Sequence, residues 1–226
     1  MVKKATAEVI EIRPIQIKTF TVHIVGDTPL IVHNWSEKAK RMMLEAQQRT
    51  TRTKPKHDIR RPFEDFVESL YWLTEKPVAD SDEELAEKYE EAVKNGAKFG
   101  IPCSAIKQAA NSAAYRKGWF SNQMALRGAY FIKGTDNPDF VTICGDAPIM
   151  REDMVTVGNG GTDLRYRAEF KNWYADLNLA YDKNGTISLE QILNCIEAGG
   201  FSVGIMEWRP EKDGTYGMFH VERMKK

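Results

Sequence analysis

The segment 164–174 places cationic and aromatic side chains at the spacing of a β-strand. Arg165, Arg167 and Lys171 share a face if the segment is extended, and Trp173 lies among three further aromatic residues. Single-stranded nucleic acid is bound through cations that follow its backbone and planar rings on which its bases stack. The segment therefore predicts a nucleic-acid-binding platform. An amphipathic strand that points its rings into the core is the open alternative.

A further cationic position lies at the start of a predicted helix over 104–117. Ser104 and Lys107 fall in its first turn, where unpaired backbone N–H groups favour an anion. Ser104 is the expected N-cap, and Gly118 is the expected end of the helix. Two interpretations of Lys107 stay open, a phosphate contact or an ordinary solvated lysine.

The chain has 32 basic and 32 acidic residues, but these charges are segregated. Residues 37–61 carry a local charge of about +6, and residues 64–91 carry about −9. Overall neutrality gives no global reason to expect nucleic acid, whereas the basic arm 48–58 and its flank are either phosphate contacts or a plain surface loop. The candidate contacts in this region are Arg52, Lys54, Lys56, Arg60 and Arg61.

The sequence offers little support for catalysis. The four histidines lie far apart and lack the spacing of a metal site. Three widely spaced cysteines predict free thiols, and residues 158–161 lack the lysine and the helix of a phosphate-binding loop. We therefore predict no catalytic residues, no metal and no cofactor.

Hydrophobic periodicity predicts the elements that position these residues. Residues 19–25 and 174–181 alternate as half-buried strands, and 129–132 and 140–144 are typical of short strands. Residues 155–157 are expected to pair with the strand 164–170 across a glycine turn.

Two helices are predicted between residues 36 and 94. Ser36 is the expected cap of the first, whose Met42 and Met43 are expected to reach the core. The acidic stretch 83–94 predicts a solvated helix that stops at Asn95-Gly96.

The closing segment 174–221 has the clearest pattern. Ser188 and Gln191 form a capping box, apolar residues then recur at helical spacing, and Gly199-Gly200 is expected to end the helix. After it, 201–208 and 216–221 are predicted to form a hairpin.

In order, these elements predict an α+β fold with a ferredoxin-like, or RNA-recognition-motif-like, βαββαβ core. We expect one domain over 1–226, with a large charged, mainly helical insertion over 34–98 after the first strand. No apolar run is long enough to span a bilayer, and the first residues lack the features of a signal peptide. A cytoplasmic protein with no membrane partner is expected.

Two stretches resemble the RAMP superfamily, the repeat-associated proteins that include backbone subunits of CRISPR effector complexes. Ile101-Pro102-Cys103-Ser104-Ala105-Ile106-Lys107 is similar to the segment that opens the family's first core helix, although Cys103 stands where glycine is usual. The closing segment resembles the family's C-terminal glycine-rich loop and final strand through Gly199, Gly200, Gly204, Gly214 and Gly217.

The resemblance implies a non-catalytic subunit that binds single-stranded RNA, a crRNA, and assembles side by side with copies of itself and other subunits in an antiviral ribonucleoprotein. It also implies an insertion that faces nucleic acid, and it suits a virus-encoded relative. Some relatives cleave RNA with a loop histidine or aspartate, which would make His57 and Asp58 the candidates here.

Two other hypotheses stay open. The same platform would serve a phage-type single-stranded DNA binding or annealing protein, because stacking and phosphate contacts do not by themselves distinguish the sugars. The acidic stretch 64–91 would suit a viral inhibitor that binds a host complex.

Overall fold

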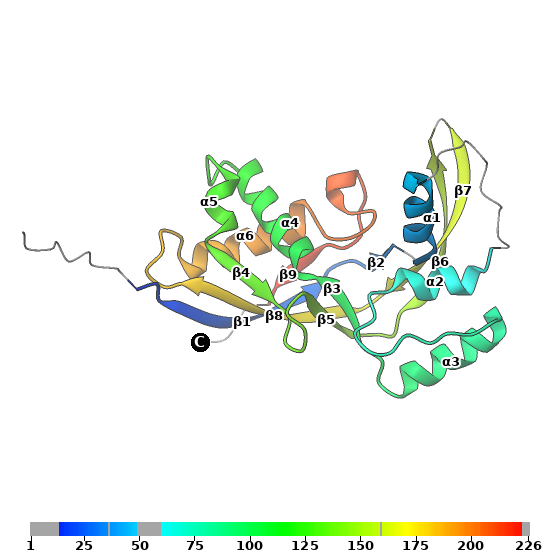
Figure 1. Cartoon of the computed structure of the whole chain (residues 1–226). Helices are drawn as coiled ribbons and strands as arrows, with labels where there is room; N and C mark the ends of the chain where they lie inside the picture. Colours follow the sequence, from blue (N-terminus) through cyan, green and yellow to red (C-terminus); the bar gives the residue numbers. More distant parts are fainter. Residues whose placement is uncertain (1–13, 36, 49–59, 159, 223–226) are drawn as a thin grey trace, which may run out of the picture.

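The computed structural model describes residues 14–35, 37–48, 60–158 and 160–222. They form an α+β structure whose strands pair antiparallel in two sheets (Figure 1). The prediction of a mixed fold is therefore confirmed.

The main sheet has the strand order β3-β5-β8-β1-β9, and β4 also pairs with β8. Strand β8 lies at its centre, with β1 along its whole length and both β4 and β5 on its other edge. The strands are β1 (Ile17–Gly26), β3 (Phe99–Pro102), β4 (Tyr130–Lys133), β5 (Phe140–Gly145), β8 (Trp173–Asp182) and β9 (Phe219–Val221).

The second sheet has the order β2-β7-β6. Its strands are β2 (Leu30–Val32), β6 (Ile149–Val157) and β7 (Gly161–Phe170). Strands β6 and β7 pair as a hairpin, as predicted, but residues 155–157 lie opposite 161–163 and not opposite 164–170. The hairpin projects away from the main sheet, toward the top of the view in Figure 1.

The two longest helices lie together on one face of the main sheet (Figure 1). These are α4 (Cys103–Arg116) and α6 (Leu189–Ser202). The others are α1 (Glu37–Gln48), α2 (Pro62–Ser69), α3 (Asp82–Lys94), α5 (Gln123–Arg127) and the short 3₁₀ turn η1 (Pro210–Lys212). Among the described residues, no helix combines the length and the apolar character that crossing a membrane requires.

Local pattern explains the elements that carry the core. In β8, Leu177 and Leu179 are buried while the residues between them are more exposed, as the alternation predicted. Trp173 and Ala175 extend this buried face, and Tyr181 is partly buried. The capping box before α6 is also confirmed, because the Ser188 side chain accepts the Gln191 N–H and the Gln191 side chain accepts the Ser188 N–H.

The path after α6 differs from the prediction. The helix does not end at Gly199-Gly200 but continues to Ser202, and both glycines are buried within it. No hairpin follows, because Met206 and Trp208 have positive φ angles of 65° and 53°, which a strand excludes. The last strand, β9, pairs with β1 instead.

The start of α4 and the exposure of α1 also differ from expectation, whereas Ser36, the expected cap of α1, lies outside the described residues. Ser104 does not cap α4, because β3 runs directly into the helix and the Cys103 N–H donates to the Asp139 carbonyl. Met42 and Met43 of α1 are about half exposed, since the core in this region forms under α2 and α3.

Candidate nucleic-acid interface

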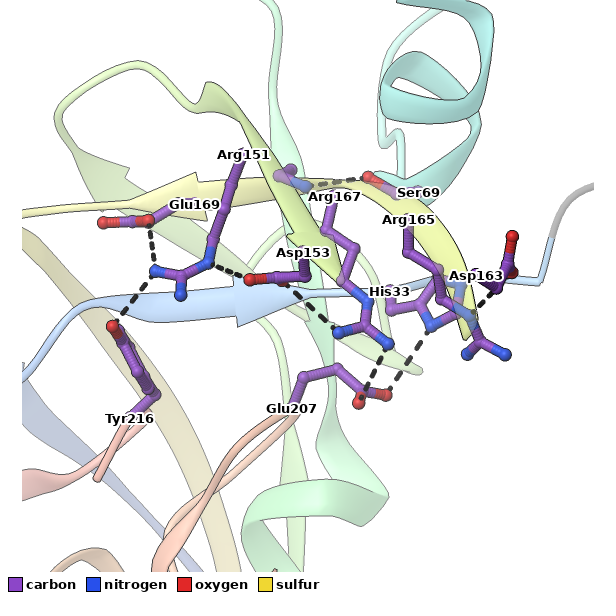
Figure 2. A network of polar contacts seen from close by, with 11 residues as sticks. His33, Ser69, Arg151, Asp153, Asp163, Arg165, Arg167, Glu169, Glu207 and Tyr216 are labelled. Carbon is purple, nitrogen blue, oxygen red and sulfur yellow. Dashed lines mark hydrogen bonds and ion pairs between the residues drawn. The ribbon is translucent and has the colours of Figure 1, made fainter. Parts of the chain in front are cut away.

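One face of the β6–β7 hairpin carries interleaved arginine and acidic side chains (Figure 2). In the antiparallel register, Arg151 lies opposite Arg167 and Asp153 lies opposite Arg165. The other face carries Ala168 and is partly covered by α2, where Ser69 Oγ accepts the Ala168 N–H at 2.9 Å. The hairpin therefore has an apolar side against α2 and a polar side toward the closing segment 203–217.

Arg151 joins the hairpin to the closing segment. Its Nε donates to Asp153 Oδ1 at 2.7 Å, and its Nη1 donates to Glu169 Oε2 and to the Tyr216 hydroxyl, both at 3.0 Å. The guanidinium also lies 4.8 Å from the centre of the Tyr216 ring. Burial lowers the pKa of Arg151, but the hydrogen bonds to Asp153, Tyr216 and Glu169 outweigh burial and raise it.

Arg167 continues this chain of contacts inside the protein. Its side chain is 4% exposed, with Nη1 3.4 Å from Asp153 Oδ2 and Nη2 3.7 Å from Glu207 Oε2. Its Nε is buried and has no hydrogen-bond partner in the described part of the chain. Glu207 Oε1 in turn lies 3.7 Å from His33 Nδ1. The contacts thus tie together the hairpin, the closing segment and the residue after β2.

A cleft of about 300 Å³ opens beside this network. Three segments meet there, namely the chain after β2, the start of α2 and the outer half of β7. The cleft is lined by His33, Asn34, Trp35, Arg60, Asp65, Asp163, Arg165 and Tyr166. An exposed indole, a tyrosine ring and two arginines therefore converge on one opening, which is the combination that nucleotide binding uses.

Arg60 organises the interior of the cleft. Its Nε donates to Asp65 Oδ2 and its Nη1 to Asp163 Oδ1, both at 2.8 Å, and its guanidinium lies 5.5 Å from the centre of the Tyr166 ring. Arg165 lies at the rim, with Nε 3.6 Å from Asp163 Oδ2. Burial raises the pKa of Asp163, but the hydrogen bond and charge of Arg60, together with the charge of Arg165, outweigh burial and lower the pKa.

A smaller cleft, of about 190 Å³, lies between α4 and the residues that follow α6. Gly204 and the backbone up to Glu207 line one side, and Gln108 and Ala109 line the other. Of the five glycines singled out in the sequence, Gly204 therefore reaches a concave surface. Gly199 and Gly200 pack inside the fold instead.

The cations predicted in and near the basic arm have different positions. Arg60 reaches the larger cleft, whereas Arg61 is partly buried and donates to Asp82, Glu64 and the Ala79 carbonyl. Outside the described residues lie Arg52, Lys54, Lys56, His57 and Asp58.

The predicted platform on 164–174 is divided by the fold. Arg165 reaches the rim of the larger cleft, and Lys171 is exposed in the bend after β7. Arg167 is buried among acidic partners. Trp173 is 2% exposed and its Nε1–H donates to the Thr28 carbonyl at 2.9 Å, so the prediction that it offers a stacking surface is wrong.

Lys107 is held by contacts within the protein. Its Nζ donates to the Arg127 carbonyl at 2.7 Å and lies 4.4 Å from the centre of the Phe131 ring. Burial lowers the pKa of Lys107. Ser104 is exposed on the first turn of α4. A phosphate contact by Lys107 would therefore replace an existing hydrogen bond.

The sequence argument missed Trp35, Asp65 and Asp163, which complete the larger cleft. No local spacing marks them, because they lie on three separate segments, namely the connection after β2, helix α2 and strand β7. One signal was available in the sequence. Acidic and basic side chains share one strand face in Arg151–Asp153 and in Asp163–Arg165–Arg167, and such a mixture suggests that the two strands pair and that their charges meet across the pair.

Acid is expected to weaken the contact at Glu207. The contact with His33 holds the pKa of Glu207 below its usual value of 4.5; burial opposes this, and the charge of Arg167 adds to the lowering. A carboxyl group with a lowered folded-state pKa stabilises the fold above its unfolded-state pKa, and this contribution is lost as the pH falls through the folded-state value. Glu207→Gln should therefore be less stable than wild type near neutral pH, and the two should converge in acid.

Denaturant unfolding of both proteins between about pH 7 and about pH 3 measures this difference. A stability difference that stays constant over that range would show that Glu207 is not the titrating group.

Models of known protein families and curated protein sequences give no match to this chain, so its function is inferred from the geometry of the cleft and the network.

Proposed function

We propose that this protein is a non-catalytic subunit that binds single-stranded RNA and assembles side by side in a multisubunit, CRISPR-type ribonucleoprotein of the cytoplasm. The cleft at Trp35 carries the proposal. Trp35 is 55% exposed, and Arg60, Arg165 and Tyr166 line the same opening. An exposed large aromatic side chain next to cations suits a stacked base and its backbone better than it suits a solvated surface.

The strand order supports a ferredoxin-like core within this proposal. Strands β9, β1, β8 and β4 are neighbours in that order, and helices α4 and α6 connect β1 to β4 and β8 to β9 on the same face. A βαββαβ chain gives this arrangement when its two halves interlock. Helices α1, α2 and α3 then occupy the predicted insertion, and the start of α2 contributes Arg60 and Asp65 to the cleft.

Exposed apolar side chains on the hairpin are consistent with further subunits as partners. Met154 lies opposite Leu164 in the register, and they are 72% and 41% exposed. Ile149 and Met150 of β6 are also exposed. Neighbouring apolar side chains on a projecting hairpin are typical of a surface that is covered in an assembly.

Binding assays with RNA and DNA of one sequence test the proposal. Fluorescence anisotropy at low salt should show binding of single-stranded RNA, and electron microscopy of the protein with its co-purified nucleic acid should show regular oligomers. Tighter binding of DNA would favour the annealing hypothesis. No binding of either nucleic acid at low salt would contradict the proposed function.

Arg165→Ala is expected to weaken RNA binding and to flatten its salt dependence. One lost phosphate contact lowers the slope of log K against log salt by about 0.7 for a single strand. Arg127→Ala is the matched control, because α5 lies at the other end of the molecule from the hairpin (Figure 1). Equal slopes for wild type and Arg165→Ala would exclude Arg165 from the phosphate contacts.

A protein-binding role is the second candidate, and α3 favours it. This helix buries Leu85 and Tyr89 and turns most of its acidic side chains to solvent. Its acidic residues are Asp82, Glu83, Glu84, Glu87, Glu90 and Glu91. The test uses protein from which nuclease has removed any nucleic acid. If this protein captures a protein complex and does not bind RNA, the protein-binding candidate is supported over the first.

A further inference from the structure

The interior of the cleft at Trp35 fits a neutral base better than a phosphate. Asp65 and Asp163 face it, and Arg60 bridges them through 2.8 Å hydrogen bonds, so the arginine's charge is already balanced there. A phosphate that entered would meet two carboxylates. A neutral planar group with N–H donors would meet acceptors that are already fixed in position.

Asp65 retains hydrogen-bonding capacity for such a group. Arg60 Nε uses one of the two acceptor sites of its Oδ2, which can accept a second hydrogen bond, while Oδ1 has no hydrogen-bond partner among the described residues. Its side chain is 34% exposed, so a ligand can reach it. The Arg60 guanidinium, held over the Tyr166 ring, fixes the carboxylate against rotation.

The pattern of donors then selects among the bases. Guanine presents the N1–H and the 2-amino group side by side, and these two donors can form parallel hydrogen bonds with one carboxylate. Adenine and cytosine each present one amino group next to a ring acceptor, and uracil presents a single N–H between two carbonyls. Splayed bases of single-stranded RNA are read on this Watson–Crick edge.

We propose that the cleft is a guanine-selective subsite, in which the base stacks on Trp35, its Watson–Crick edge bonds to Asp65, and Arg165 at the rim faces the backbone. This inference rests on the proposed function and deepens it, because it names the base that the site takes. Asp163 helps to position Asp65, because it accepts a hydrogen bond from Arg60 Nη1 and so holds the guanidinium that also binds Asp65.

The test compares short oligouridines that carry one central guanosine, inosine or adenosine. Inosine lacks the 2-amino group and keeps the N1–H, so it removes one of the two expected bonds. Wild type should bind the guanosine oligonucleotide about five- to tenfold more tightly than the inosine one. Asp65→Asn should abolish this ratio, since an amide presents a donor where the carboxylate presented an acceptor.

The ratio is the readout because removal of a negative charge by itself tightens binding of any oligonucleotide. Asp136→Asn is the matched control, because Asp136 is exposed and pairs with Lys98 away from the cleft. Asp163→Asn serves as a second variant and should also lower the ratio.

Equal binding of the guanosine and inosine oligonucleotides by wild type would overturn the subsite and leave the proposed function standing. A ratio that persists in both Asp65→Asn and Asp163→Asn would place base selection elsewhere and overturn the subsite as well. Failure to bind any of the oligonucleotides would contradict the proposed function itself.

Discussion

Replacement of Asp153 by Ala is expected to lower the free energy of unfolding by about 3–5 kcal/mol, because it leaves buried positive charge without its main partner. Asp153 is 7% exposed and accepts from Arg151 at 2.7 Å and from Arg167 at 3.4 Å. Without it, the looser contact with Glu207 at 3.7 Å is the one ion pair that Arg167 keeps among residues 14–35, 37–48, 60–158 and 160–222. Denaturant unfolding monitored by circular dichroism measures the loss.

Asp176→Ala is the matched control. Asp176 also lies on a strand and also has a close partner, His23 Nδ1 at 2.7 Å, but its side chain is half exposed. An exposed pair contributes about 0–1 kcal/mol. Comparable losses for the two variants would show that burial of Arg167 does not make its pairing costly to break.

A double replacement separates the charge from the shape of this site. Asp153→Leu together with Arg167→Met removes both charges and keeps most of the volume, and such exchanges of buried pairs are often neutral or stabilising. The double variant should therefore be more stable than Asp153→Ala. If the double variant also binds RNA as wild type does, the charges of Asp153 and Arg167 are not needed for binding, and packing is sufficient to position the hairpin.

The sequence predicted the elements whose stabilising contacts are local. The alternation in β8 and the capping box of α6 depend on neighbouring residues, and both are present. The β6–β7 hairpin was also predicted, since its glycine turn and its paired strands are adjacent in the chain.

The prediction failed where hydrogen bonds connect distant segments. Residues 203–208 contain apolar side chains that suit a strand, but the Ile205 N–H donates to the Gly217 carbonyl and the Glu207 N–H to the Ile31 carbonyl. Such bonds bend the chain into left-handed conformations at Met206 and Trp208. The hydrophobic periodicity of the sequence does not reveal these long-range hydrogen bonds.

The candidate site was predicted in part, for the same reason. Arg60 and Arg165 were identified because cations are visible in a sequence, whereas Trp35, Asp65 and Asp163 become a site only when β2, α2 and β7 meet. Trp173 and Arg167 show the opposite error, in which residues predicted to bind are buried. Their residue types fit a binding platform, but Trp173 lies on the buried face of β8, and Arg167, which shares a strand face with the partly exposed Arg165, is buried beside Glu207 of the closing segment.

Gly200→Ala is expected to destabilise the protein by about 3 kcal/mol, the upper end of the usual cost of overpacking, because the neighbouring backbone atoms leave little room to relax. A Cβ atom at Gly200 would lie 1.9 Å from the Phe219 carbonyl oxygen and 2.8 Å from its carbonyl carbon. These are backbone atoms of β9, which pairs with β1 and cannot move independently of the sheet. Gly128→Ala is the control, since nothing lies within 4 Å of its Cβ position.

The Gly200 variant also tests what the glycines of the closing segment do. If Gly200 is required by packing, Gly200→Ala should lower the unfolding free energy and, at a temperature where it remains folded, should bind RNA as wild type does. If Gly200 is required for close approach of the nucleic-acid backbone, binding should fall in the folded variant with little loss of stability. The burial of Gly200 between α6 and β9 favours the first result. Gly204, which lines the smaller cleft, is then the glycine of this segment whose replacement should be tested for binding.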